Sequence, residues 1–270
     1  MRFGKLYIRF IKVYMKSRLE YRFSLVVELL ANLILIGVHF SGIFIIYSNF
    51  SNIVDWDIYE FIFLFTTNWM SYSLSSFLFW MPMGGFGNLL RSGEFDSYLI
   101  RPLNPLIHLV IRQFQYTFIP RLLLAIIFWG YSIGRVHIDW SIIKVVYLLL
   151  TIISGFFICS GIFIVTGSVS FWTIQSTELT SLLTNNDYGL RTYVDYPLTM
   201  FNKKVQFLLS FVVPYAFTGF YQVVFLLDKD PGGIGQSIFQ WAFPLIALII
   251  FSIALQVWKQ GIKKYGSTGN

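Results

Sequence analysis

The sequence has little charge and almost no cysteine, and each shortage excludes a class of protein. Only 12% of its 270 residues are charged, whereas a soluble domain has about 25%. Hydrophobic residues make up 56% of the chain and aromatic residues 20%, so much of its surface must face lipid rather than water. The single cysteine, Cys159, lies in an apolar run, which excludes an intrachain disulfide and a cysteine-rich metal site.

Motifs for chemistry are also absent. The P-loop pattern G-x-x-x-x-G-K-[ST] does not occur, so the chain does not bind nucleotide phosphates by that route. His39, His108 and His137 are scattered, and none has a partner at metal-ligand spacing. We therefore expect this chain to contain no catalytic centre, no metal and no cofactor. The net charge of +7 fits anionic membrane lipid better than nucleic acid, because the basic residues cluster at the borders of apolar runs.

Long apolar stretches are what the sequence has in abundance. A helix needs about 20 apolar residues to cross a bilayer. Six stretches meet this need, over residues 23–47, 59–81, about 115–133, about 142–165, 205–227 and 238–258. The sequence therefore predicts an all-α integral membrane protein with six transmembrane helices. A transmembrane domain, 23–258, would lie between an N-terminal segment, 1–22, and a tail, 259–270.

The distribution of basic residues predicts the orientation in the membrane. With the N-terminus inside, all lysines and arginines except Arg135, Lys144 and Lys229 fall on the cytoplasmic side. The positive-inside bias then places both termini in the cytoplasm, which requires an even number of spans. The loops 84–114 and 173–204 would also be cytoplasmic.

The N-terminal segment has the pattern of an amphipathic helix. Lys5, Arg9, Lys12 and Lys16 recur at steps of four, three and four residues, which places them on one helical face. Aromatic residues from Phe3 to Tyr14 repeat the same spacing on another face. This pattern is typical of a helix that lies in the headgroup region and binds membrane lipids.

Polar residues form stripes along two of the predicted spans. The first stripe consists of Asn68, Ser71 and Ser75, and the second of Ser210, Thr218 and Gln222. Such residues pack helices together, or they line a translocation path for an amphiphilic solute. Both interpretations stay open at this stage. A secondary carrier or channel driven by an ion gradient is the alternative function, and the lack of several carboxylates within the spans argues against it.

The loop after the second span, 87–106, is divided by residues that end and start helices. Gly93 can end a first helical piece in a left-handed conformation. Asp96 can cap a second short turn, 97–100, which the following proline must end. Asn104, followed by proline, can start the helix that leads into the third span. The loop is thus predicted to form a rigid polar projection suited to docking on another protein.

The same loop carries a family resemblance. Residues 90–105 read LRSGEFDSYLIRPLNP, which closely resembles ABC-2 type permeases of the branch in which one ATPase gene accompanies two related membrane subunits. Tyr196-Pro197 and the string FVVPYAF over 211–217 resemble later segments of that branch. The likeness in layout covers nearly the whole chain, although residues 173–193 fit no pattern of the family.

The resemblance implies a function. The chain would be a non-enzymatic permease subunit of an exporter in the bacterial cytoplasmic membrane, moving an amphiphilic or hydrophobic solute out of the cytoplasm. It would form a heterodimer with a second, related permease and bind two copies of a separate ATPase, which would hold ATP and Mg. The loop after the second span would be the coupling helix that contacts the ATPase. By position, the contact residues would be Arg91, Glu94, Phe95, Asp96 and Arg101.

Overall fold

A computed structural model describes most of the chain. The described residues are 22–50, 56–113, 117–173, 177–234 and 237–266, and they form helices and turns without a strand. The predicted all-α class is therefore confirmed for the part of the chain that the structure describes. The predicted interfacial helix over 1–22 lies, except for Arg22, outside these residues.

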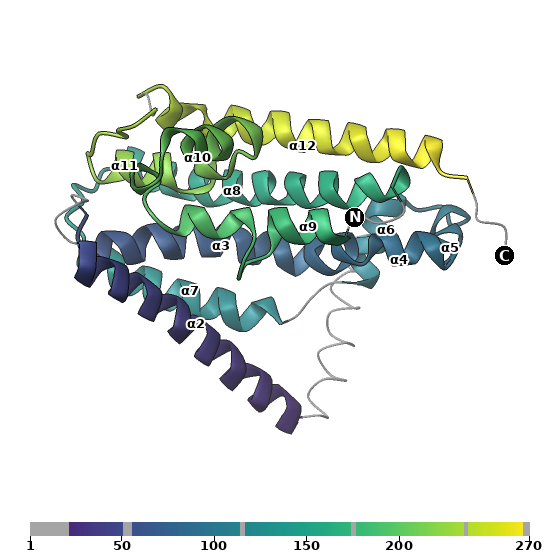
Figure 1. Ribbon diagram of the computed structural model, residues 1–270, viewed down its shortest axis with the longest axis horizontal. Helices are drawn as coiled ribbons and strands as arrows, with labels where there is room; N and C mark the ends of the chain where they lie inside the picture. The colour runs from purple at the N-terminus through teal and green to yellow at the C-terminus, as the bar shows by residue number, and fades with distance from the viewer. Residues whose placement is uncertain (1–21, 51–55, 114–116, 174–176, 235–236, 267–270) are drawn as a thin grey trace.

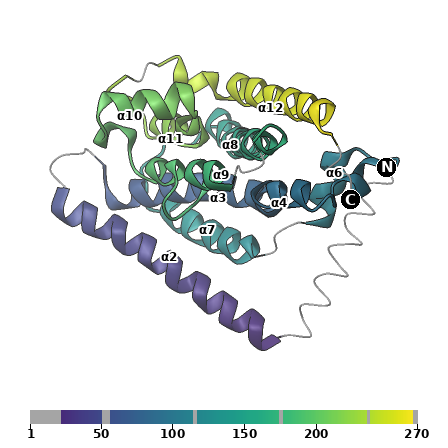
Figure 2. The same cartoon turned by 45° about the vertical axis from the view of Figure 1, so that its right-hand side comes forward.

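Five long helices dominate the fold: α2 Arg22–Phe50, α3 Ile58–Gly84, α7 Phe118–Ile133, α8 Ile142–Ser168 and α12 Phe239–Lys264. The helices α3, α7, α8 and α12 run side by side, with α3 and α8 central, whereas α2 diverges from the bundle (Figures 1 and 2). These helices agree with the predicted spans within a few residues at most ends. The clearest difference is α12, which continues to Lys264 and makes half of the predicted tail helical.

Two helices among the described residues are long and apolar enough to cross a membrane, Ile142–Phe171 and Phe239–Lys264. Leu30–Gly42 and Phe118–Ile133 are apolar but shorter. The helix α3 has 27 residues, yet its asparagine, serine, threonine and tyrosine side chains lower its hydropathy. The number of six spans therefore stays a prediction.

The predicted fifth span, 205–227, is not one helix, so that prediction was wrong. It divides into α10 Lys203–Phe207, a π-helical turn Leu208–Val212, a 3-10 turn Tyr215–Thr218 and α11 Phe220–Leu226. Pro214 explains the first break, because proline lacks a backbone N–H and clashes with the preceding turn. At Gly219 a Cβ atom would lie 2.6 Å from Oδ1 of Asn68, so the backbone packs directly on that amide.

The segment 173–204 is not a loop at one end of the bundle, which corrects a second prediction. It contains α9 Thr177–Thr184 and the 3-10 turns Leu190–Asp195 and Leu198–Met200. The Tyr72 hydroxyl donates to the Thr184 carbonyl (2.8 Å), and the Asn68 amide donates to the Val194 carbonyl (2.7 Å). The later residue of the segment, Val194, contacts the earlier residue of α3, Asn68. The segment therefore runs antiparallel to α3, from its end toward its beginning.

The two ends of the bundle differ in character. The helices α10 and α11 lie where α3 begins, which we call the α10–α11 end (Figures 1 and 2). There Lys229 pairs with Glu60 at 2.5 Å, and Lys144 pairs with Asp228 at 2.7 Å. The short helices α4 Phe86–Arg91, α5 Asp96–Leu99 and α6 Pro105–Arg112 lie at the opposite end, which we call the α4–α6 end (Figure 1). Residues 203–206 are thus far from the α4–α6 end, contrary to the expected position of this segment.

Close helix contacts depend on small residues. Gly155 of α8 faces α3, where a Cβ atom would lie 2.7 Å from Cβ of Ser71 and 3.0 Å from the Thr218 carbonyl oxygen. Gly130 of α7 is a contrasting case, because nothing lies within 4 Å of the same position. The contact between α3 and α8 therefore requires glycine at 155, in line with the small residues that let membrane helices approach closely.

The substitution Gly155→Ala is expected to destabilise the bundle by about 1–3 kcal/mol, because the added methyl group overpacks the contact of α3 with α8. Thermal unfolding of the detergent-solubilised protein measures this effect. Gly130→Ala is the matched control, and it should leave the melting temperature unchanged or raise it, since alanine favours helix over glycine by about 1 kcal/mol. Equal melting temperatures for the two variants would contradict the close contact.

A buried ion pair holds the segment 177–200 against α3. Arg191 Nη1 lies 2.5 Å from Asp195 Oδ1, and the two side chains are 1% and 3% exposed. The guanidinium lies 4.8 Å from the centre of the Tyr72 ring, and the Trp69 indole N–H donates to Asp195 Oδ2 at 3.2 Å. Each charge is thereby compensated within the bundle, as buried charges must be.

Removing one partner should leave an uncompensated buried charge. Asp195→Ala is expected to destabilise the protein by about 3–5 kcal/mol for that reason. Asp228→Asn is the control, because Asp228 is 64% exposed, asparagine can still accept a hydrogen bond, and Lys144 also donates to the Leu226 carbonyl at 3.2 Å, so little stability should be lost. Thermal unfolding in detergent compares the variants, and a control that melts as early as Asp195→Ala would refute the role of the buried pair.

Candidate functional site

Three short helices form the projection at the α4–α6 end: α4 Phe86–Arg91, α5 Asp96–Leu99 and α6 Pro105–Arg112. Gly93 follows α4 with a φ of 69°, a left-handed conformation that glycine adopts without strain. Its N–H donates to the Leu90 carbonyl at 3.2 Å. The predicted glycine stop is therefore confirmed.

The predicted starts of the next two helices have different outcomes. Asn104 caps α6 as predicted, because its Oδ1 accepts from the N–H groups of Leu106 (3.0 Å) and Ile107 (3.5 Å). The prediction for Asp96 was wrong, since Asp96 is the first residue of α5 and Phe95 holds the capping position without a side-chain hydrogen bond. The carboxylate of Asp96 is therefore available for a different contact.

The projection is attached to the bundle by a cluster of aromatic rings, which we call the aromatic anchor: Phe86, Phe95, Phe171, Trp258 and Tyr265. Phe95 has no exposed surface. Its ring centre lies 5.1 Å from that of Phe86, 5.8 Å from that of Phe171, 5.4 Å from that of Tyr265 and 6.1 Å from that of Trp258. Phe86 is the first residue of α4 and thus part of the projection, whereas Phe171 follows α8, Trp258 is in α12 and Tyr265 follows α12, so one side chain connects the projection to two long helices.

The backbone of α12 also contacts the aromatic anchor. At Gly261 a Cβ atom would lie 2.8 Å from Cε2 of Phe171, so only glycine lets the ring rest on this helix. Burial and then the hydrogen bond and negative charge of Asp96 raise the pKa of Tyr265, which follows α12. Asp96 is half-buried and near enough to Tyr265 to affect its pKa, whereas Phe95 is fully buried against the chain's own bundle.

The outer surface of the projection carries the other predicted contact residues. Arg91, Glu94 and Arg101 are exposed, and Arg91 Nη2 donates to Asn88 Oδ1. Ile100, which the sequence analysis did not single out, is 84% exposed. The sequence signal that could have predicted its exposure is its place in the loop, next to Arg101 and two residues before Pro102. The surface thus combines charged groups with an exposed apolar side chain, a composition suited to binding a protein.

The base of the projection is packed by Tyr98 and His108. Their ring centres lie 4.7 Å apart, and the Arg112 guanidinium lies 5.4 Å from the Tyr98 ring. Burial, followed by the charges of Arg101 and Arg112, lowers the pKa of His108. The imidazole is therefore uncharged near neutral pH, and it serves as a packing group between α5 and α6.

The structure buries all six residues of the predicted translocation path: Asn68, Ser71, Ser75, Ser210, Thr218 and Gln222. Asn68 accepts a hydrogen bond from the Thr218 hydroxyl at 2.7 Å, and Ser75 pairs with Ser160 at 3.0 Å. The others bond to the Ile152 carbonyl, the Tyr221 hydroxyl and the Phe217 carbonyl. In the conformation described these residues join helices, and a role in a path stays a prediction.

Comparison with known families identifies the chain. The family described as "ABC-2 family transporter protein" matches residues 33–269, which include the projection and every long helix except the first part of α2. Comparisons with curated proteins and with solved structures find no match. The family is the membrane component of ABC transporters, it lacks a nucleotide-binding domain, and it implies an ABC ATPase as partner. The chain belongs to the ABC-2 transporter family and is a transmembrane permease.

Proposed function

We propose that this chain is the permease subunit of an exporter that moves an amphiphilic or hydrophobic solute out of the cytoplasm. The energy comes from ATP hydrolysis by a separate ATPase subunit. One observation carries the proposal: the projection directs Arg91, Glu94 and Arg101 outward while Phe95 is packed against the ends of α8 and α12. A chain without a nucleotide-binding motif must receive its energy through such a contact.

The contacts of the aromatic anchor give a route for this energy. The ATPase binds the exposed charges of the projection by charge-assisted hydrogen bonds, which are stronger than neutral ones. Movement of the projection displaces the Phe95 ring, which contacts Phe171 after α8 and Trp258 in α12. Because protein interiors are close-packed, these helices must shift or rotate in response.

The full exporter contains more than this chain. Two copies of the ATPase bind ATP and Mg and close on each other, and a second, related permease completes a heterodimer. The path for the solute then opens between the two permeases when their helical bundles rearrange. Apolar residues on α2, including Leu30, Ile34 and Val38, are exposed in the isolated chain and meet lipid or the second permease.

The orientation follows from the two ends of the bundle. The α4–α6 end faces the cytoplasm of a bacterial cell, and the α10–α11 end faces outward. Residues 177–200 then make the fifth crossing, and 203–227 enter the membrane from outside and return to the same side. This assignment keeps six crossings with both termini in the cytoplasm. Lys203 and Lys204 move to the outer side, and most basic residues still lie inside.

Cysteine labelling tests this orientation. The native Cys159 is 1% exposed, and Cys159→Ser provides a background without a thiol. A membrane-impermeant maleimide should label Lys203→Cys in intact cells and Arg101→Cys only in inside-out vesicles. Labelling of both positions from the same side would overturn the reassigned fifth crossing.

Substitutions in the projection test coupling to the ATPase. Arg101→Glu should weaken ATPase binding at least about tenfold, because a hydrogen bond to a charged group contributes about 1.5–3 kcal/mol. Asp96→Ala removes the contact with Tyr265 and should lower both transport and the stimulation of ATP hydrolysis. Both variants should still insert into the membrane.

The assay is ATP hydrolysis and solute efflux by the reconstituted complex, together with co-purification of the ATPase. Lys203→Glu is the matched control, because it reverses an exposed charge at the α10–α11 end. The control should behave as the unsubstituted protein does. Normal ATPase stimulation in both Arg101→Glu and Asp96→Ala would refute the docking role, as would a permease that transports without any ATPase.

A further inference from the structure

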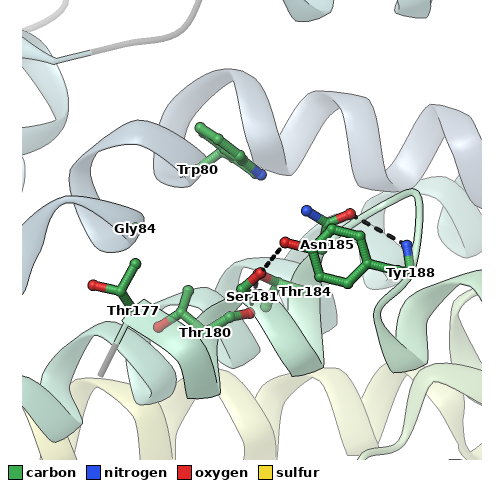
Figure 3. A pocket seen from close by; sticks show the side chains of 8 residues that line it. All are labelled: Trp80, Gly84, Thr177, Thr180, Ser181, Thr184, Asn185 and Tyr188. Atoms are coloured by element: carbon green, nitrogen blue, oxygen red, sulfur yellow. Dashed lines mark hydrogen bonds between the residues drawn. The ribbon is translucent and has the colours of Figure 1, made fainter. Parts of the chain in front are cut away.

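A cavity of about 270 Å³ lies between the last turns of α3 and the helix α9 (Figure 3). Its lining consists of Trp80 and Gly84 from α3, Thr177, Thr180, Ser181 and Thr184 from α9, and Asn185 and Tyr188 from the turn that follows. Nothing described so far assigns it a role. The volume of the cavity is close to the lower limit for small-molecule sites, whose volumes are roughly 300–1,000 Å³.

The α9 side of the cavity is a face of hydroxyl groups. Thr177, Thr180, Ser181 and Thr184 stand at positions i, i+3, i+4 and i+7 of the helix, which places them on one face. Figure 3 shows Trp80 on α3 across the cavity from this face. No residue of the lining is charged. The cavity is therefore uncharged, with a few polar groups set in a mainly apolar lining.

One of these hydroxyl groups lacks a partner although it is buried. Thr180 is 4% exposed, and its Oγ1 forms no hydrogen bond with any described residue. The neighbouring Thr184 differs, because its hydroxyl donates to the Thr180 carbonyl at 2.7 Å. Burying a hydroxyl group without a partner is unfavourable. A ligand that supplies the missing hydrogen bond accounts for this arrangement.

The turn after α9 orders two more polar groups. Asn185 Oδ1 accepts from the N–H groups of Asp187 (2.7 Å) and Tyr188 (3.3 Å). This arrangement fixes the amide and leaves its NH₂ group to act as a donor. Ser181 and Tyr188 share a hydrogen bond of 2.5 Å between their hydroxyl groups (Figure 3). Together with the Trp80 indole N–H, the cavity offers both donors and acceptors at fixed positions.

These groups select a class of ligand. The lining has no lysine, arginine or histidine to neutralise a phosphate and no carboxylate to neutralise an ammonium group, so it favours an uncharged ligand. Hydroxyl groups and an amide opposite an aromatic face suit a sugar or another polyol, whose hydroxyl groups donate and accept while its C–H face rests on the ring. Leu179 and Leu182 of the same helix are 39% and 55% exposed, which gives an apolar surface for acyl chains.

We propose that this cavity binds the uncharged, polyhydroxylated headgroup of a lipid, and that this lipid is the class of solute that the exporter moves. The second part rests on the proposed function. Trp80 and Gly84 are in the last turns of α3, so the cavity lies in the half of the bundle nearer the α4–α6 end. A headgroup there is taken up from the cytoplasmic leaflet.

The experiment uses the complete complex with its ATPase in nanodiscs of phosphatidylglycerol, to which monoglucosyl diacylglycerol is added in steps. Native mass spectrometry measures retention of the glycolipid, and the rate of ATP hydrolysis measures its effect. The glycolipid should bind saturably and stimulate hydrolysis. Thr180→Val keeps the shape of the side chain but removes its hydroxyl group, so it should weaken glycolipid binding about threefold to tenfold.

Two further variants complete the design. Thr151→Val makes the same change in α8, where the hydroxyl bonds to the Tyr147 carbonyl, and should leave glycolipid binding unchanged. Ser181→Leu fills the cavity and should abolish saturable binding, which keeps a test available if Thr180→Val does not fold.

The outcomes separate the two proposals. A complex that hydrolyses ATP but neither retains the glycolipid nor responds to it overturns the headgroup site and leaves the permease function intact. Stronger retention of phosphatidylglycerol that Thr180→Val weakens also overturns it, since the ligand is then anionic. If no ATPase associates with the permease, the proposed function is contradicted. The headgroup site is then tested with the permease alone: saturable retention of the glycolipid supports the site, and no retention overturns it.

Discussion

Phe95 has no exposed surface, and its ring packs on Phe86 of α4 and on aromatic side chains from the ends of α8 and α12. The geometry of the projection depends on this contact. Because the ring is held on several sides, the turn that carries Glu94 and Arg101 cannot move without moving the helix ends. Gly261 strengthens the dependence, since the absence of a side chain there lets Phe171 rest on the backbone of α12.

A second constraint is that polar groups inside the bundle must find partners within the chain, because lipid offers none. Several amides, hydroxyls and charges along α3 meet this constraint with the segment 177–200 and with Thr218. Asn68 bonds to both Val194 and Thr218, and Tyr72 bonds to Thr184 while its ring faces Arg191. An irregular segment can therefore lie where an ordinary apolar helix would be expected.

Local signals in the sequence predicted local structure well. Gly93 and Asn104 end and start helices as expected, because conformation and capping depend on a few neighbouring residues. Hydropathy wrongly predicted one continuous helix for the fifth span. Residues 205–227 are apolar, but the helix is interrupted at Pro214 and Gly219. Hydropathy also gave no sign that 177–200 packs along α3, because the hydrogen bonds from Tyr72 and Asn68 to this segment join residues more than 100 positions apart. In the site, position identified the exposed arginines, but only packing shows that Phe95 is directed inward.

The pair of Arg191 and Asp195 has a consequence for the energetics of transport. Moving one elementary charge through a membrane potential changes the free energy by about 2.3 kcal/mol per 100 mV. The two side chains lie in one buried unit with no net charge. If they stay together when the bundle rearranges, the voltage across the membrane does no net work on the pair. The membrane potential then neither drives nor opposes the movement of these two charges.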